Sequence, residues 1–327
     1  DREAYAAQTS GADAATKILR NTLVPPTFVQ VNGEDKAITI KDNSYTLLDK
    51  DGNEVSTTPA YAADGTTVIG NFTIDPATGQ VTFTPTDKSY TGKVTPVKVQ
   101  AESSNGIKVD TTYTPEIVPV TPTATPAETT DIQGATQTGK PEFKGGTVTV
   151  DGVEKTVEIN EDVPATFDDG STTKTVDGVG TYTVAADGTV TFVPEKSFVG
   201  TAPAVTVVRE DKNGTKASAT YTPTVTPVTP TATPAESTGP QGLVQTGTVT
   251  FTEGDEVAPI NKDSITLLDE NGQPAASVEA KSPAGDVIGT FTVDKDTGVV
   301  TFTPTDKSYS GDVVPVKVQA ADTNGTT

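Results

Sequence analysis

Apolar and polar residues alternate over short segments along most of this chain. Segments such as Thr82-Phe83-Thr84, Val97-Lys98-Val99 and Val316-Lys317-Val318 place apolar side chains at every second position, and many of their residues are β-branched. Because successive side chains of a strand point to opposite faces of a sheet, one face of each segment would be buried and the other would face water. The pattern therefore predicts half-buried β-strands.

Turn sequences separate these segments. Asp75–Gly79 and Asp294–Gly298 each offer an Asp that can bond the turn backbone and a Gly that can take positive φ, and Ala186-Asp187-Gly188 is a shorter version. Further Asp-Gly or Asn-Gly pairs begin at Asp51, Asn105, Asp151, Asn213, Asn271 and Asn324. About six or seven short strands per repeat, with turns roughly every 8 to 12 residues and no amphipathic helix, are typical of an antiparallel, immunoglobulin-like β-sandwich.

The chain repeats itself. Val68–Tyr90 and Val287–Tyr309 differ at only five positions, and a diverged copy lies between them, from Gly180 onward. We therefore expect an all-β tandem array of three sandwich domains: repeat 1 over residues 25–118, repeat 2 over 119–226 and repeat 3 over 227–327. The neighbouring repeats would be one another's partners within the chain.

A proline-rich stretch, PVTPTATPAE, stands at each junction, at 119–128 and again at 227–236. Its regular proline spacing favours an extended polyproline II segment over a flexible coil. Threonine and alanine between the prolines are also found in glycosylated mucin-like stalks, but the stretch is short for that role. We interpret it as a semi-rigid linker that stops one sandwich and starts the next.

The first 24 residues differ from the rest. They are rich in alanine and lack the alternating pattern, which predicts a short helix interrupted near Ser10-Gly11 and stopped by Pro25-Pro26. We expect residues 1–24 to be the end of a preceding non-repetitive region. A membrane-binding or partner-binding helix is the alternative, but its apolar stripe would be thin.

Aromatic residues recur at equivalent positions in the repeats, one in most predicted strands. Tyr113 and Tyr221 each follow the Asn of an Asn-Gly turn by eight residues, and the matching position of repeat 3 would fall beyond residue 327. We therefore expect the last strand of repeat 3 to be truncated. We assign the aromatic residues to the core, and sugar stacking is the weaker interpretation. They are Phe72, Tyr182 and Phe291; Phe83, Phe192 and Phe302; Tyr90, Phe198 and Tyr309; and Tyr113 and Tyr221.

The composition limits the chemistry. The chain has no Cys, His, Met or Trp, which removes thiol nucleophiles, imidazole bases, disulfides and zinc sites built from Cys or His. With 23 Lys plus Arg against 44 Asp plus Glu, the net charge is −21, so a nucleic-acid partner is not expected. No apolar stretch is long enough to span a membrane.

Several acidic and basic groups are candidates for functional sites. Asp49–Glu54 resembles the start of a calcium loop but lacks its closing Glu, so a hairpin turn is favoured. The pairs Glu161-Asp162 and Asp168-Asp169 could flank a glycosidic bond, yet they do not recur in the other repeats. Lys98 and Lys317 could form isopeptide crosslinks, although Thr206 takes their place in repeat 2. We assign no catalytic, cofactor or metal site.

The longest repeated blocks carry a family resemblance. TPTATPAESTGPQG, QTGTVTFTEGD and GTFTVDKDTGVVTFTPTDKSYSGDVVPVKVQA resemble the fibril repeat of CshA-type surface adhesins of oral streptococci, over roughly residues 25 to 327. Repeat 2 departs from this pattern, with Val193-Pro194-Glu195 in place of Thr-Pro-Thr-Asp.

The resemblance implies a non-enzymatic stalk. Such repeats would project an N-terminal adhesive region from the Gram-positive cell wall, anchored by a sorting signal outside these residues. The parent protein would bind host fibronectin and other bacteria through regions outside this chain. In the alternative interpretation, each repeat is itself a weak adhesion module, for itself, for fibronectin or for another host surface, and multiplicity supplies avidity.

Overall fold

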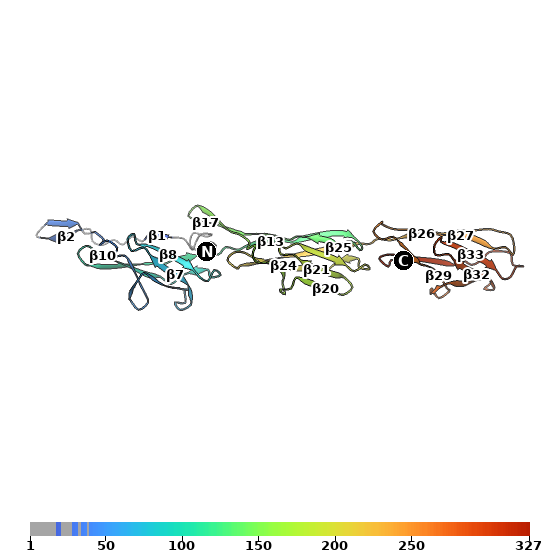
Figure 1. Cartoon of the computed structure of the whole chain (residues 1–327), viewed down its shortest axis with the longest axis horizontal. Helices are drawn as coiled ribbons and strands as arrows, with labels where there is room; N and C mark the ends of the chain where they lie inside the picture. Colours follow the sequence, from blue (N-terminus) through green and yellow to red (C-terminus); the bar gives the residue numbers. More distant parts are fainter. Residues whose placement is uncertain (1–17, 21–27, 32–33, 38) are drawn as a thin grey trace.

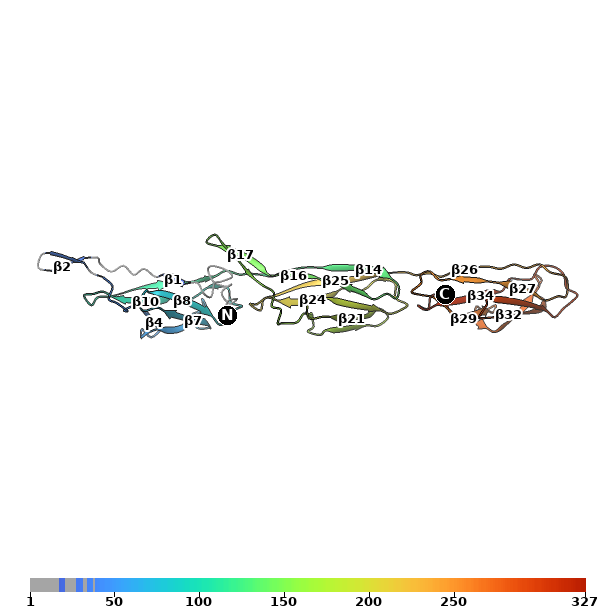
Figure 2. The same ribbon diagram turned by 45° about the horizontal axis from the view of Figure 1, so that its top comes forward.

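The computed structural model describes residues 18–20, 28–31, 34–37 and 39–327. Within these residues the secondary structure consists of strands and turns, without a helix. The strands gather into three bodies that follow one another along the long axis of the molecule (Figure 1), and the view turned by 45° shows the same row (Figure 2). The predicted tandem array of three β-sandwiches is confirmed.

Two antiparallel sheets form repeat 1. Its strands are β1 (Ile18–Arg20), β4 (Thr46–Leu48), β5 (Glu54–Val55), β6 (Thr57–Tyr61), β7 (Val68–Ile74), β8 (Gln80–Pro85), β10 (Val97–Glu102) and β11 (Lys108–Tyr113). They pair in the orders β1-β8-β7-β6 and β11-β10-β4-β5. Two further pairs join β12 (Glu116–Ile117) to β9 (Gly92–Lys93) and β2 (Phe28–Val31) to β3 (Glu34–Ala37).

The core of repeat 1 lies between its two sheets. Side chains along β7 and β8 alternate between buried and accessible, as the sequence pattern predicts. Phe72 and Phe83 meet across these strands with ring centroids 5.6 Å apart, and Tyr113 from the other sheet packs edge-on against Phe72 at 5.9 Å. Burying such rings removes a large apolar area from water, and the core is therefore organised around aromatic residues.

Repeat 2 has the same plan with additions. Its strands are β13 (Thr123–Thr125), β14 (Ala127–Ile132), β15 (Gln137–Gly139), β16 (Glu142–Lys144), β17 (Gly146–Val150), β18 (Val153–Val157), β19 (Thr166–Phe167), β20 (Thr173–Val176), β21 (Gly180–Val184), β22 (Val190–Pro194), β23 (Gly200–Thr201), β24 (Val205–Glu210) and β25 (Lys216–Thr226). The main sheets run β15-β22-β21-β20 and β14-β25-β24-β19, with β23 also on β25. The pairs β13–β16 and β17–β18 stand apart.

One pairing in repeat 2 departs from the antiparallel expectation. The strand β14 runs parallel to β25 over six residue pairs, from Ala127 opposite Tyr221 to Ile132 opposite Thr226. The strand β14 lies at the edge of its sheet, where its only neighbour is β25, the last strand of the repeat. A strand from the start of the repeat and its last strand therefore lie side by side.

Repeat 3 is built from fewer strands. They are β26 (Thr231–Thr233), β27 (Gln245–Thr248), β28 (Thr250–Thr252), β29 (Ile260–Leu268), β30 (Pro274–Ala275), β31 (Ser277–Lys281), β32 (Val287–Val293), β33 (Val299–Pro304) and β34 (Lys317–Asp322). The sheets are β27-β33-β32-β31 and β30-β29-β34, and β26 pairs with β28. Phe291 and Phe302 are only partly buried here, whereas their counterparts Phe72 and Phe83 are 1% and 0% exposed.

Two sequence expectations change in the structure. Ile18–Arg20 forms β1 and pairs with β8, so the predicted helix over residues 1–24 is wrong for these three residues; the others of that segment lie outside the described residues. Pairing with a neighbouring strand outweighs the weak helical preference of such a short segment. The prolines also do not keep the linker separate from the repeats, because β13 and β26 both lie inside the repeated PVTPTATPAE stretch.

Candidate functional site

The two connections between the sandwiches are the features most relevant to a tandem array. Between β12 and β13, and again between β25 and β26, the chain passes through the same four residues, at 119–122 and 227–230. We call these Pro-Val-Thr-Pro segments the connectors. The valine of each is buried, with Val120 8% and Val228 4% exposed. Each connector is therefore packed against protein and is not a free tether.

A glycine of the following repeat lets each connector lie close to the sandwich. A Cβ added at Gly146 would stand 2.3 Å from the carbonyl oxygen of Thr121, and one added at Gly254 would stand 2.5 Å from that of Thr229. These distances are far below van der Waals contact, so only glycine fits at either position. The repeated Gly thus fixes where the connector crosses the next repeat.

The first connector has an additional apolar contact. Val120 packs with Val148 and Val157 in a small cluster separate from the main cores. Val148 and Val157 belong to the β17–β18 hairpin, which projects from repeat 2 beside the junction with repeat 1 in Figures 1 and 2. This hairpin supports the connector from one side.

Gln133 lies at the centre of the contact between repeats 2 and 3 around the second connector, which we call the second joint. Its side-chain oxygen accepts a hydrogen bond from the backbone N–H of Val228 at 3.2 Å, and its amide nitrogen donates to the carbonyl of Lys196 at 2.8 Å. The same nitrogen donates to the Thr326 hydroxyl of repeat 3 at 3.4 Å. With 3% of its surface exposed, Gln133 satisfies its polar atoms inside the joint. It therefore ties the end of repeat 2, the connector and repeat 3 together.

The turn Asp322–Thr326 of repeat 3 forms the other side of this joint. The Asp322 carboxylate accepts the backbone N–H groups of Asn324 and Thr326, each at 2.9 Å, which fixes the turn. The Asn324 side chain then donates to the Gln133 carbonyl at 3.3 Å and lies over Gly134, where an added Cβ would stand 2.5 Å from its oxygen. The contact is polar, buried and shape-specific.

Repeat 2 carries a matching turn. Asp211 accepts the backbone N–H groups of Asn213 and Thr215, at 2.9 and 2.8 Å. Asp211 and Asn213 are buried, and each has one side-chain oxygen that finds no hydrogen-bond partner among the described residues. Burial raises the pKa of the Asp211 carboxyl, because the charged form loses water. Among the described residues, no group of three or more Asp or Glu side chains is placed to hold a metal ion.

The acidic candidates lie in turns and in ion pairs. Asp49 accepts the N–H groups of Asp51 and Asn53, each at 2.9 Å, in the turn between β4 and β5. Asp168 pairs with Lys174 at 3.2 Å, while Glu161 pairs with Arg209 at 3.1 Å. The two acidic pairs are therefore engaged with different cations. Lys98 and Lys317 are exposed on their strands.

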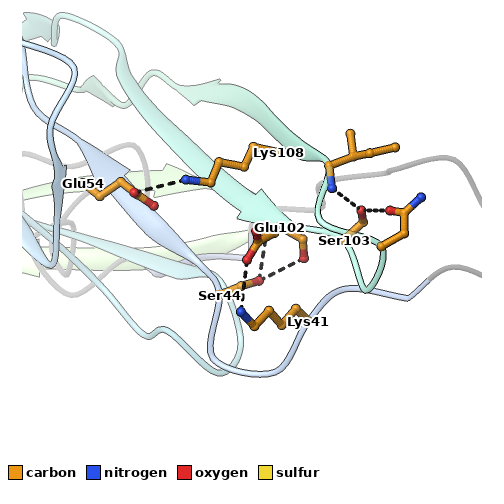
Figure 3. A network of polar contacts seen from close by, with 8 residues as sticks. Lys41, Ser44, Glu54, Glu102, Ser103 and Lys108 are labelled. Carbon is orange, nitrogen blue, oxygen red and sulfur yellow. Dashed lines mark hydrogen bonds and ion pairs between the residues drawn. The ribbon is translucent and has the colours of Figure 1, made fainter.

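A cavity of about 480 Å³ in repeat 1 is lined by charged and polar side chains. Several of them form the polar network drawn in Figure 3. Lys41 pairs with Glu102 at 3.2 Å and Lys108 with Glu54 at 3.4 Å, while the Ser44 hydroxyl bonds the backbone of Glu102. Exposed ion pairs of this kind contribute little to the stability of the fold. In repeat 3 the Ser264 hydroxyl makes the same backbone contacts with Ala321, but this Ala carries no charge in place of Glu102. Repeat 3 therefore has no counterpart of the Lys41–Glu102 ion pair.

Sequence reasoning missed the joint residues. Gln133 and Asn324 stand 191 positions apart, so no local pattern links them. A signal did exist in the repeats, because Gln-Gly recurs at Gln133 and Gln241 and Asn-Gly-Thr recurs at Asn213 and Asn324.

The part of the chain that the structure describes has no helix that is long and apolar enough to cross a membrane.

Three sandwiches in a row, joined by identical connectors, define a tandem β-sandwich repeat protein. A family model described as the surface adhesin CshA repetitive domain matches residues 6–117, 119–225 and 227–327. The chain belongs to this family and is a repeat region of the surface-adhesin type. The first match begins before residue 25, where the sequence pattern had placed the start of repeat 1.

Solved structures and curated proteins add further likenesses. Repeat domain 13 of the fibrillar adhesin CshA from Streptococcus gordonii is 60% identical, over 20% of this chain and 86% of that one, with a TM-score of 0.14. A tetra-tandem repeat from the extending region of a large adhesion protein is 20% identical, over 88% of this chain and 65% of that one, with a TM-score of 0.23. The oligopeptide-binding protein AliA of Streptococcus pneumoniae is 48% identical over 50 residues, which are 15% of this chain and 8% of AliA.

Proposed function

We propose that these repeats form a stiff, non-enzymatic spacer of a bacterial surface fibril, which holds an adhesive region away from the cell wall. The observation that carries this proposal is the pair of connectors. Each has only four residues, and its valine is buried. A flexible linker would leave these side chains in water and let the repeats reorient.

The charge distribution supports the same role. The net charge of −21 is spread over all three repeats, and like-charged neighbours resist folding back on one another over about 8 to 10 Å at physiological salt. In this proposal the fibril is extracellular and anchored to the cell wall, and binding to host fibronectin or to other bacteria belongs to regions of the parent protein outside these residues.

Small-angle X-ray scattering tests the spacer. The native chain should scatter as one extended particle, while a variant with Gly-Ser-Gly-Ser in place of 119–122 and of 227–230 should give a broader and shorter distribution of dimensions. Equal distributions would contradict the proposal. The alternative role, weak adhesion by each repeat, is tested separately by binding of the native chain to immobilised fibronectin. Saturable binding at micromolar concentration would favour adhesion modules over a pure spacer.

A further inference from the structure

The outer face of one sheet of repeat 2 carries a row of threonines. The row crosses β15, β22, β21 and β20 through directly opposed residues, which are Thr138, Thr191, Thr183 and Thr173. Their neighbours along the strands, such as Tyr182 and Phe192, are fully buried in the core. Because successive side chains of a strand point to opposite faces, the threonines point away from the core, and all four are accessible to solvent.

The same row recurs in the other two repeats. Across the three corresponding strands its residues are Thr82, Thr73 and Thr57 in repeat 1 and Thr301, Thr292 and Ser277 in repeat 3. The strands β7, β21 and β32, which each carry one of these threonines, lie on the lower side of the molecule in both Figure 1 and Figure 2. The three rows therefore share one side of the molecule, and we call this surface the threonine face.

The rows of the threonine face are uncharged, although the chain carries a net charge of −21. The outer face of the opposite sheet differs, since in repeat 1 it presents Lys98, Lys108 and Asp110. In repeat 3 Glu279 lies beside the row, on the edge strand β31, where its carboxylate can stay in water. Removing charged groups from water is costly, whereas threonine is neutral. Two acidic chains can therefore approach each other at the lowest cost through this face.

The chemistry of threonine makes such a face complementary to a copy of itself. Each side chain presents a methyl group, which gains free energy when it leaves water, and a hydroxyl that both donates and accepts a hydrogen bond. On this face of repeat 2 the hydroxyls of Thr175 and Thr181 already lie 3.3 Å apart and bond across two strands. When two identical faces meet, each hydroxyl can find a partner and no charge is buried.

The area of the threonine face fits an interface made by several repeats at once. Four strands about 4.8 Å apart, each contributing about five residues of 3.3 Å, cover roughly 19 by 17 Å, or about 320 Å² per repeat. One pair of facing repeats would bury about 650 Å² in total, which is below the roughly 1,200 to 2,000 Å² of specific interfaces. Three pairs in line would bury about 1,900 Å² and reach that range.

We propose that the threonine face is a lateral interface, through which two copies of this chain pair side by side. The sheets of facing repeats would pack about 10 Å apart, with their strands nearly aligned, so that all three repeats meet their counterparts. The inference does not depend on the spacer function, because pairing requires the face and not the stiffness of the connectors.

Sedimentation velocity of the native chain of 327 residues tests the pairing. Dimers should form as the protein concentration rises through the micromolar range. They should be more stable at an ionic strength of about 1 M than at about 0.15 M, because salt screens the repulsion between two acidic chains. Small-angle X-ray scattering of the dimer should show a larger cross-section and an almost unchanged maximum dimension, as expected for two chains side by side.

Two matched double variants locate the interface. Thr73→Glu with Thr183→Glu places like charges on the threonine face of repeats 1 and 2, and it should raise the dimer Kd by at least about 10-fold. Thr112→Glu with Thr220→Glu adds the same charge to the outer face of the opposite sheets and should change the Kd by less than about 3-fold. All four threonines are exposed, so both variants should remain folded.

Four results would overturn the proposal. The chain could stay monomeric at both salt concentrations up to millimolar protein, or the two double variants could weaken the dimer equally, which would assign the effect to net charge alone. Dimers with a doubled maximum dimension would show end-to-end contact. A monomeric chain that is retained on a dextran column, and released by Thr73→Glu with Thr183→Glu, would assign the face to a neutral polysaccharide.

Discussion

Replacing Gln133 by alanine tests whether the second joint is held by its side chain. The substitution removes the hydrogen bonds to Lys196, Thr326 and Val228, and it leaves the buried N–H of Val228 without its side-chain partner. A net hydrogen bond contributes about 1 kcal/mol, and a buried polar group left unpaired costs about 1 to 3 kcal/mol. The free energy that favours the closed joint should therefore fall by about 2 to 4 kcal/mol, which lowers the ratio of closed to open joints roughly 30- to 1,000-fold.

Single-molecule energy transfer can measure this change. The chain has no cysteine, so Thr173→Cys in repeat 2 and Asn271→Cys in repeat 3, both at exposed positions, give unique labelling sites. The native joint should give one narrow distance distribution, and Gln133→Ala should broaden it. Gln241→Ala alters the equivalent, exposed glutamine of repeat 3 and should change nothing. A distribution for Gln133→Ala as narrow as that of the control would refute the role of the side chain.

Three further predictions concern the connectors, the cores and pH. Gly254→Ala should force the carbonyl of Thr229, in the second connector, away from residue 254 and cost about 1 to 3 kcal/mol, measured by denaturation of repeat 3; an unchanged midpoint would show that the backbone shifts freely. Phe192→Ala should destabilise repeat 2 by about 3 to 5 kcal/mol, and Phe302→Ala should destabilise repeat 3 clearly less, because Phe302 is already partly exposed. Hydrogen exchange measures the stability of each repeat separately, and equal losses would contradict the looser packing of Phe302. Burial raises the pKa of Tyr113 and of Tyr182 to about 12. The stability that these two residues contribute is therefore complete below their pKa in the unfolded chain, near 10, and is lost as the pH rises towards 12. Tyrosinate absorbance that rises in step with a free-tyrosine standard would count against this shift.

The sequence predicted what depends on local alternation and on repetition. The strands at Thr82-Phe83-Thr84 and Val97-Lys98-Val99, and the buried aromatic residues Phe72 and Phe83, follow from a period of two and from alignment of the repeats. Such features depend on neighbouring residues along the chain, so one sequence contains enough information to find them.

The joint could not be predicted in the same way. The burial of Val120 depends on the β17–β18 hairpin, and the role of Gln133 depends on a turn in another repeat. The parallel pairing of β14 with β25 joins residues more than 90 positions apart, and alternation does not distinguish parallel from antiparallel neighbours. Ile18–Arg20 pairs with β8 although its surroundings are rich in alanine, because tertiary pairing overrides weak propensity.

The parallel pairing of β14 with β25 determines how repeat 2 responds to tension. The first connector leads into the start of β14 through β13, and β25 leads directly into the second connector. When the two ends are pulled apart, β14 and β25 are dragged in opposite directions along their own axes. The load is then shared by all the hydrogen bonds across the six residue pairs, and no single bond can be peeled open first. Tension along the chain would therefore load repeat 2 in shear, the direction in which a short β-ladder resists rupture most strongly.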